Sequence, residues 1–434
     1  MTGALEREQR QFRALVRLFA YRFFDTDILS VRGDLSSLLS QRAALLAALS
    51  LVIVLVVAPK YASLYQHLTA QQLRSAALAD QEFLLSTSMA IIGVFTLLLW
   101  DALFPDRRDC LILGAMPVRI RTVFTAKVAA LGAALALAIV AVNCFSGLVC
   151  PFLIVPDAAG ALSAVRDFVA FWFVILLASG FVFLLLMGMQ GAALHLLPHH
   201  LFLRWSSRIQ TAAFFAVLTL YFLAPPLPTA NAWAKLVPSY WFFGLFQVLT
   251  GSANPVMIAL SHRALVGTGL TALIALGTYA MAYARQMRRT VEQSGIAPSR
   301  SRMIPWAEIA RVFIRRAPER AILTFVGRTL ARSRQHRLLL SIYAGMGLAY
   351  VFSQVAYVLY HFKTPPPGAT EGPAQTVLGI PLILLFFLII GLRVSFSIPI
   401  ELRANWLFRL TDPFGRGVYL DATRKALGLS RWCP

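Results

Sequence analysis

Long apolar runs divide the chain into stretches that are long enough to cross a membrane. A helix needs about 20 mostly apolar residues to span a hydrocarbon core ~30 Å thick. Eight stretches meet that length, and charged, polar or proline-containing segments separate them. The pattern therefore predicts an all-α polytopic membrane protein with about eight transmembrane helices. They are expected at residues 43–63, 83–104, 122–148, 168–193, 208–226, 262–284, 338–360 and 377–400.

One further apolar stretch, Ser239–Thr250, is too short to span a membrane alone. We interpret it as a re-entrant or interfacial segment, because the aromatic run Tyr240–Phe243 is of the type that gathers at the headgroup boundary. The alternative is a true span that extends through Leu260. That span would reverse the orientation of every later helix.

The N-terminal segment is amphipathic with the 3.6-residue period of an α-helix. Its arginines Arg10, Arg13 and Arg17 fall on one face. The opposite face carries the apolar residues Phe12, Leu15, Val16, Phe19 and Phe23. We expect a helix that lies in the interface plane with its arginines toward anionic headgroups. A helix that binds a partner protein is the alternative.

The composition excludes several classes of protein. Of the 434 residues, 58% are hydrophobic and 14% are charged, whereas soluble domains average ~45–50% and ~25%. A disordered chain, a coiled coil and an ordinary soluble enzyme do not have this composition. The net charge of +21 would by itself also fit a nucleic-acid-binding protein.

The positive charges lie unevenly on the two sides of the predicted topology. With the N-terminus inside, 34 of the 40 lysines and arginines fall on the inner side and six on the outer side. Such an excess marks cytoplasmic loops, so both termini are expected in the cytoplasm. The loops then account for the basicity, and no nucleic-acid partner is expected.

The same pattern divides the chain into five segments. A loop between the sixth and seventh spans carries thirteen arginines and no lysine, and we expect short helices at the membrane surface there, one of them near Trp306–Ile314. The expected segments are a cytoplasmic interfacial amphipathic segment (1–42), a six-span transmembrane domain (43–284), a basic cytoplasmic loop (285–337), a two-span part (338–400) and a cytoplasmic C-terminal segment (401–434).

The sequence lacks the motifs of the common catalytic sites. It contains no phosphate-binding G-x-x-x-x-G-K-[ST] and no Gly-Lys dipeptide, and neither H-E-x-x-H nor G-x-S-x-G occurs. The span interiors are nearly free of ionisable groups, which ion-coupled secondary transporters place near the midplane. No catalytic, cofactor-binding or metal-ligating residue is therefore predicted, and a secondary transporter is disfavoured.

Two groups of candidate ligands have simpler interpretations. His195 and His199 have the spacing of a helical metal pair, but Pro198 favours a helix end at the headgroups. Cys144 and Cys150 do not face each other on one helix, so free buried thiols are expected unless the helix ends between them.

Polar residues inside the predicted spans favour helix packing. They are Asn143, Gln190 and Gln354. In lipid such side chains usually join helices by hydrogen bonds worth ~0.6–2 kcal/mol. Contact with a substrate is the alternative.

The segment after the second span carries a resemblance to a known family. It contains a cluster of both charges within Asp101–Asp109, then Leu111–Pro117, and then Arg119, Arg121 and Lys127. This segment resembles the cytoplasmic loop of ABC-2-type exporter permeases, which docks on a separate ATPase subunit. The amphipathic N-terminus also resembles the interfacial helix of these permeases, with Arg10, Phe12, Arg13, Arg17 and Phe19 as its residues.

The resemblance implies an ATPase-docking loop. Apolar residues of the loop form one face, and its charges can select a partner and a register. The loop residues concerned are Phe104, Asp106, Arg107, Arg108, Asp109, Leu111, Ile112, Leu113 and Pro117.

Two later segments, Arg328–Arg337 and Ile398–Arg409, are similar to a bacterial group of longer permeases. That group continues with further spans, so we expect the segment that ends at Arg431–Pro434 to be a truncated end. The similarity also implies a bacterial inner membrane as the location.

The leading hypothesis is thus the permease subunit of an ATP-driven exporter, which is not itself an enzyme. It would have no cofactor in this chain, and ATP would bind a partner, the ABC ATPase subunit, in two copies. The other expected partners are membrane lipids and a second permease, as a homodimer or heterodimer. The apolar spans favour an amphiphilic or lipid-like cargo.

The alternative is a membrane-embedded lipid-modifying enzyme or a multispan assembly protein without transport activity. Its best site would be Asp101, Asp106 and Asp109 with Arg107 and Arg108, which could hold a metal and a lipid phosphate. The spacing matches no known metal motif. A solvated docking loop is the simpler interpretation.

The charge distribution makes the topology testable. Reporter fusions after Arg289 should report the cytoplasm, and fusions after Ala159 and Pro366 should report the periplasm. A periplasmic signal from within residues 285–337 would contradict the eight-span topology.

Overall fold

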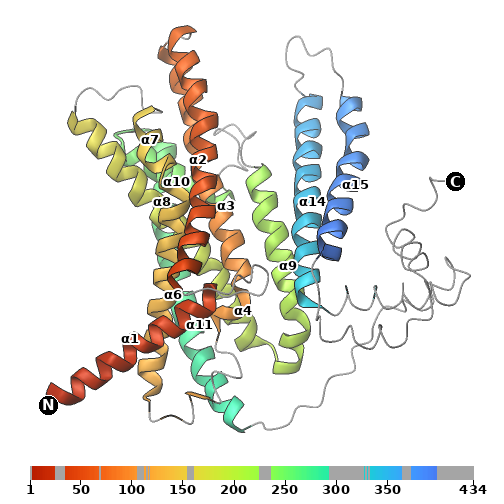
Figure 1. Cartoon of the computed structure of the whole chain (residues 1–434). Helices are drawn as coiled ribbons and strands as arrows, with labels where there is room; N and C mark the ends of the chain where they lie inside the picture. Colours follow the sequence, from red (N-terminus) through yellow and green to blue (C-terminus); the bar gives the residue numbers. More distant parts are fainter. Residues whose placement is uncertain are drawn as a thin grey trace, which may run out of the picture. The chain divides into compact units, whose positions relative to one another are not determined.

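The computed structural model describes residues 2–24, 35–67, 70–104, 112–113, 116, 118–153, 161–223, 236–292, 327, 330, 333–363 and 373–397. Helices dominate these residues, and no strand occurs among them, which confirms the all-α class for this part of the chain. The helices are α1 (Thr2–Phe24), α2 (Leu35–His67), α3 (Ala70–Leu98), α4 (Trp100–Leu103), α6 (Ile120–Asn143), α7 (Ser146–Leu153), α8 (Ala161–Leu196), α9 (His199–Leu223), α10 (Pro238–Leu249), α11 (Pro255–Glu292), α14 (Arg334–Lys363) and α15 (Pro373–Ser397) (Figure 1).

A helix lies at each of the eight predicted spans, and six of these helices are long and apolar enough to cross a membrane. The other two are α9, whose first turns carry histidine and arginine, and α14, whose apolar part is limited to Leu339–Val355. Eight spans therefore remain a prediction. The six segments that qualify within the described residues are Ala43–Tyr61, Ala76–Leu98, Arg121–Asn143, Leu162–Leu196, Pro255–Ala282 and Leu378–Phe396.

Helix ends differ from the predicted span ends at several places. The third span was expected at 122–148, but α6 ends at Asn143 and α7 begins at Ser146. The second span was expected at 83–104, but α3 begins at Ala70 and ends at Leu98, where a turn at Leu99 separates it from α4. The sixth span was expected to end at 284, but α11 continues to Glu292. Glutamine, arginine and methionine at the end of α11 are good helix formers, so the helix does not stop where its apolar run stops.

The chain forms two compact units. The first unit contains residues 1–213 and 220–294, and the second contains residues 214–219 and 295–434. The helix α9 contributes residues to both. The surface helix expected at Trp306–Ile314 and the segment 401–434 lie outside the described residues.

The core of the first unit surrounds α8. Helices α3, α7, α10 and α11 pack on α8, and α1 packs on α6. One apolar cluster joins α1, α4, α6, α8 and α11 through buried side chains such as Phe19, Leu103, Phe183 and Tyr279. The amphipathic N-terminal helix thereby becomes part of the folded unit.

The short apolar stretch forms α10, and a tight turn separates it from α11. Gly251 has a φ of +105°, a left-handed conformation that glycine adopts without a steric penalty. Its backbone N–H donates to the carbonyl of Val248, and that of Ser252 donates to the carbonyl of Gln247. The alternative of one span running through Leu260 is therefore wrong, because the chain reverses here.

Helices α10 and α11 pack side by side in opposite directions. Gly244 of α10 faces Leu260, and Trp241 faces Gly267 further along α11. The twelve residues of α10 extend about 18 Å, well short of a ~30 Å hydrocarbon core. A segment that does not span is therefore confirmed.

Most of the aromatic side chains of α10 lie inside the protein, and their position at the headgroup boundary stays a prediction. Tyr240, Phe242 and Phe243 are buried, and the ring of Phe242 lies 5.4 Å from that of Phe181 in α8. Packing against α8 and α11 removes these rings from the surface. The run of aromatic residues in the sequence could not show whether their rings are buried in lipid or in the protein.

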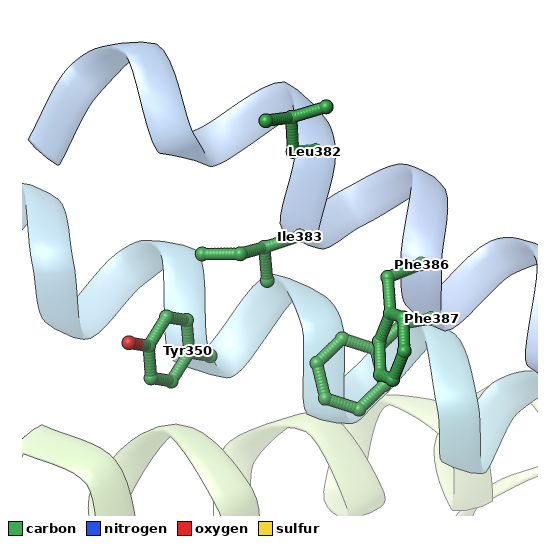
Figure 2. A pocket seen from close by; sticks show the side chains of 5 residues that line it. All are labelled: Tyr350, Leu382, Ile383, Phe386 and Phe387. Carbon is green, nitrogen blue, oxygen red and sulfur yellow. The ribbon is translucent and has the colours of Figure 1, made fainter. Parts of the chain in front are cut away.

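The second unit is a close helical hairpin. Gly347 of α14 faces Phe387 of α15, and Gly391 of α15 faces Tyr343 of α14. An apolar groove of about 440 Å³ lies on this hairpin (Figure 2). The residues that line it are Tyr350, Leu382, Ile383, Phe386 and Phe387.

The packing of α10 on α11 predicts a marked cost for a single methyl group. A Cβ at position 244 would lie 2.6 Å from Leu260 Cβ and 3.0 Å from the carbonyl oxygen of Met257. Gly244→Ala should therefore lower the free energy of unfolding by about 1–3 kcal/mol, measured by denaturation in detergent micelles.

The matched control is Gly277→Ala on α11, where a Cβ meets nothing within 4 Å. This substitution should be neutral or stabilise the helix by up to about 1 kcal/mol. Equal stability of the two variants would show that α10 does not pack on α11 as described.

Candidate functional site

The loop predicted to dock an ATPase begins directly after the α3–α4 junction, which we define as Leu97–Leu103. The backbone carbonyls in the last turn of a helix have no partner within the helix. In hydrocarbon an unsatisfied carbonyl costs several kcal/mol, so other groups must donate to these oxygens. The junction contains two such helix ends within seven residues.

Side chains of three other helices supply those donors. Gln210 Nε2 of α9 donates to the carbonyl of Leu97 at 2.7 Å. Gln190 Nε2 of α8 donates to the carbonyl of Trp100, also at 2.7 Å. The hydroxyl of Tyr279, in α11, donates to the carbonyl of Leu103 at 3.0 Å. The junction is thus hydrogen-bonded to α8, α9 and α11.

The indole of Trp100 adds a fourth bond in the opposite sense. Its Nε1–H donates to Ser206 Oγ of α9 at 3.0 Å, and the Trp100 side chain is fully buried. Helix α9 therefore has two polar links to the junction, one to Leu97 and one to Trp100.

Both glutamines leave their own amide oxygen without a partner. The Oε1 atoms of Gln190 and Gln210 are buried and accept no hydrogen bond from the described residues. A buried unsatisfied acceptor costs ~1–3 kcal/mol. Each side-chain amide is therefore held by the backbone carbonyl to which it donates, while its own oxygen stays without a hydrogen bond.

The loop itself is anchored in the apolar cluster. Phe104 and Leu113 are 6% and 5% exposed, and the ring of Phe104 lies 5.1 Å from that of Tyr279. Ile112 and Met116 are 52% and 49% exposed. Of the predicted docking residues, Phe104 and Leu113 thus support the loop from inside, and Ile112 faces outward.

The remaining predicted docking residues lie outside the described residues. They are Asp106, Arg107, Arg108, Asp109, Leu111 and Pro117. Their part in docking stays a prediction. The metal cluster of the alternative hypothesis falls largely on the same residues, and the described part of the chain contains no group of three or more histidine, cysteine or acidic residues that could hold a metal ion.

The apolar face of α1 packs against the protein itself. Leu15, Phe19 and Phe23 are buried in the cluster, and Lys127 Nζ of α6 lies 5.4 Å from the centre of the Phe19 ring. Glu8 pairs with Arg119 at 3.7 Å. This face is therefore taken up by α6 and its neighbours, which leaves little of it for the partner protein of the alternative interpretation.

The basic face of α1 is open. Arg10, Arg13 and Arg17 are exposed, and Phe12, on the other side, is half-buried. Arg10 has only an exposed, long ion pair with Glu6, at 3.9 Å. Contact of these arginines with anionic headgroups stays a prediction.

A second polar cluster joins α2, α3 and α10 far along α3 from the junction. Lys60 Nζ of α2 pairs with Asp80 of α3 at 2.6 Å. Ser239 Oγ of α10 donates to Glu82 at 2.7 Å, and Gln247 donates to Gln81 at 2.6 Å. Two adjacent residues of α3 thus hold α10 by hydrogen bonds.

Several ionisable side chains within the candidate spans contact neighbouring helices. Asp80 and Glu82 lie within the candidate span of α3, and Lys127 lies within that of α6. Glu82 is 5% exposed and has no basic partner among the described residues. All three side chains lie within the first seven residues of their candidate spans, so the expectation of nearly uncharged span interiors stays a prediction. These side chains tie neighbouring helices together.

Two candidate ligand pairs have structural roles. Helix α8 ends at Leu196 before Pro198, so His195 and His199 belong to different helices and the helical metal pair is ruled out. His195 offers its backbone carbonyl to Arg285 at 3.3 Å. Cys144 and Cys150 are free thiols.

Cys150 is unsuited to act as a nucleophile. Burial and, to a smaller extent, the charge of Asp80 raise the pKa of the Cys150 thiol to about 12. The thiolate, which is the reactive form, is therefore almost absent at neutral pH.

The helix-joining role expected for polar span residues is confirmed for Asn143 and Gln190. Asn143 accepts a hydrogen bond from Ser88 at 2.6 Å and donates to the carbonyl of Ile139. Sequence reasoning missed Gln210 and Tyr279. Gln210 gave the same signal as Gln190, a lone amide next to an apolar run, whereas nothing in the sequence distinguished Tyr279 from other aromatic residues.

Comparison of the chain with protein-family models, with curated proteins and with solved structures gives no significant match.

The bond between Ser239 and Glu82 predicts a measurable contribution to stability. Ser239→Ala removes the donor and leaves a buried carboxyl oxygen unsatisfied, so the free energy of unfolding should fall by about 1–3 kcal/mol. Thermal denaturation in micelles or nanodiscs measures the change.

Ser261→Ala is the matched control, because Ser261 is also buried but donates only to a carbonyl of its own helix, that of Ile258. Its effect should stay below about 1 kcal/mol, since such a bond within a helix contributes little. Equal losses in the two variants would mean that the Ser239–Glu82 bond does not hold α10.

Proposed function

We propose that this chain is the membrane-spanning permease subunit of an ATP-driven exporter of the ABC-2 type, in a bacterial cytoplasmic membrane with both termini inside. A separate ATPase subunit docks on the loop after α4. ATP binding to that subunit biases the equilibrium between two conformations of the spans. The cargo is amphiphilic or lipid-like.

The observation that carries the proposal is the anchored loop after α4. Its buried residues Phe104 and Leu113 fix it to the cluster, while Ile112 and Met116 are about half exposed. A binding surface is most effective when its supporting side chains are held by packing. The loop therefore combines a rigid support with apolar side chains that a partner can cover.

The chemistry of the helices supports a transport role better than catalysis. Six helices are long and apolar enough to span. Of the acidic side chains described inside them, Asp80 and Glu82 contact Lys60 and Ser239 of neighbouring helices, and Asp167 pairs with Arg166 of its own helix. Few polar groups are thus left for hydrated ions, which favours an amphiphilic cargo.

Charge reversal in the loop tests the docking site. Arg107→Glu with Arg108→Glu should weaken binding of the ATPase by about 2–5 kcal/mol if these charges are buried in the contact. At a solvated rim the loss would stay below ~1 kcal/mol. Co-purification of the ATPase with parent and variant, matched for expression, measures the effect.

Arg263→Glu serves as the control, because Arg263 is an exposed cation in α11 that the predicted topology places on the outer side, away from the loop. It should leave recovery of the ATPase unchanged. If all variants recover the ATPase equally, the loop is a connector and the docking site lies elsewhere, with residues 285–337 as the next candidate. If the parent itself recovers no ATPase, the proposed function fails.

A further inference from the structure

Helix α9 is held to the first unit in an unusual way. The apolar cluster that contains Phe104 and Leu113 includes residues of α1, α4, α6, α8 and α11, but none of α9. The links of α9 to the α3–α4 junction are polar: Gln210 donates to the carbonyl of Leu97, and Trp100 donates to Ser206. Apolar packing therefore couples the loop to the other helices, and hydrogen bonds couple the junction to α9.

These two bonds are well placed to carry a displacement. Gln210 is 1% exposed, and Leu97 and Trp100 are equally buried, so water cannot replace the donor or acceptor of the Gln210–Leu97 bond. Ser206, which accepts the Trp100 bond, is half-buried. A bond broken in such surroundings leaves a buried polar group unsatisfied. When the junction moves, α9 must therefore follow or lose both bonds.

The loop is attached to the junction at both of its described anchors. Phe104 directly follows Leu103, and Leu113 is buried in the same cluster as Leu99 and Leu103. A partner that pulls or pushes the loop acts on the junction through these side chains.

We infer that Gln210 and Ser206 are positioning residues that transmit movement of the loop to α9 through the backbone and indole of the α3–α4 junction. The inference rests on the proposed function for the source of the movement, which is the docked ATPase. The link itself belongs to this chain and is measurable without the ATPase.

The first arm of the test uses the full chain alone, in nanodiscs of phosphatidylethanolamine and phosphatidylglycerol. Leu113→Ala loosens the loop anchor. Hydrogen exchange of the α9 backbone amides at residues 206–213 is then measured. We expect exchange about tenfold faster than in the parent, because the loosened junction releases α9. Leu113→Val is the milder variant to use if Leu113→Ala does not fold.

The decisive comparison repeats this substitution after the link is removed. In a chain with Gln210→Leu and Ser206→Ala, Leu113→Ala should change α9 exchange by less than about twofold, because neither hydrogen bond between the junction and α9 remains to pass the change on. A purely structural role of the two residues would raise exchange but leave the effect of Leu113→Ala unaltered. Equal effects in both backgrounds, or no effect on α9 in the parent, would overturn the inference.

A control variant tests whether replacing any glutamine in a helix would abolish the response of α9 to Leu113→Ala. Gln354 lies in α14 of the second unit and belongs neither to the junction nor to the anchors of the loop. Gln354→Leu should therefore preserve the response of α9 to Leu113→Ala. Loss of the response in this background would overturn the inference as well.

The second arm uses the complex with co-purified ATPase, trapped with ATP and vanadate. Trapping should alter α9 exchange in the parent complex and leave it unaltered in the Gln210→Leu, Ser206→Ala complex, with the ATPase still bound in both. An unchanged response to trapping in the variant would overturn the inference. Failure to recover any ATPase would instead overturn the proposed function, and the first arm would still decide whether α9 is linked to the loop.

Discussion

The need to satisfy every backbone carbonyl in a medium without water determines how the first unit is assembled. An uninterrupted helix meets this need by itself, but the turn at Leu99 creates helix ends in the buried part of the protein. Gln190, Gln210 and Tyr279 supply the missing donors. One interruption in one helix thus ties three other helices to the same junction, each through one hydrogen bond to a backbone carbonyl.

Close helix contact provides the second organising principle, and it uses small residues. Gly244 and Gly267 allow α10 and α11 to approach until side chains touch backbone, and Gly347 and Gly391 do the same for α14 and α15. Without a hydrophobic driving force between helices in lipid, such contacts and a few hydrogen bonds have to supply the association energy. The polar contacts at Glu82 and Gln81 then define where along α3 the short helix α10 comes to rest.

The sequence predicts the helices better than their contacts. Periodicity and apolar length locate α1 and a helix at each expected span, because both signals depend only on neighbouring residues. The turn at Leu99 has no glycine or proline to mark it, so a span running to 104 was the natural prediction. Burial of Tyr240 and Phe243 depends on α8 and α11, which no local pattern contains.

The same limit applies to the candidate site. The mixture of apolar and charged residues in the loop could be recognised from the sequence, and so could a helix-joining role for Gln190. In the structure Phe104 and Leu113 face inward, whereas Ile112 faces outward. This arrangement depends on the position of Tyr279, about 170 residues later in the chain. Long-range contacts of this kind decide which loop residues support the proposed docking surface from inside and which residues form it.

The short helix α10 has a consequence for how the protein is made. A helix of twelve residues is too short to be recognised as a span during synthesis, and its partners Gln81 and Glu82 belong to a helix synthesised about 160 residues earlier. The hydrogen bonds that hold α10 thus join segments made far apart in time, and none of them can form before α10 has been synthesised. Until Ser239 reaches its place, the carboxyl of Glu82 lacks the donor that it has in the folded unit.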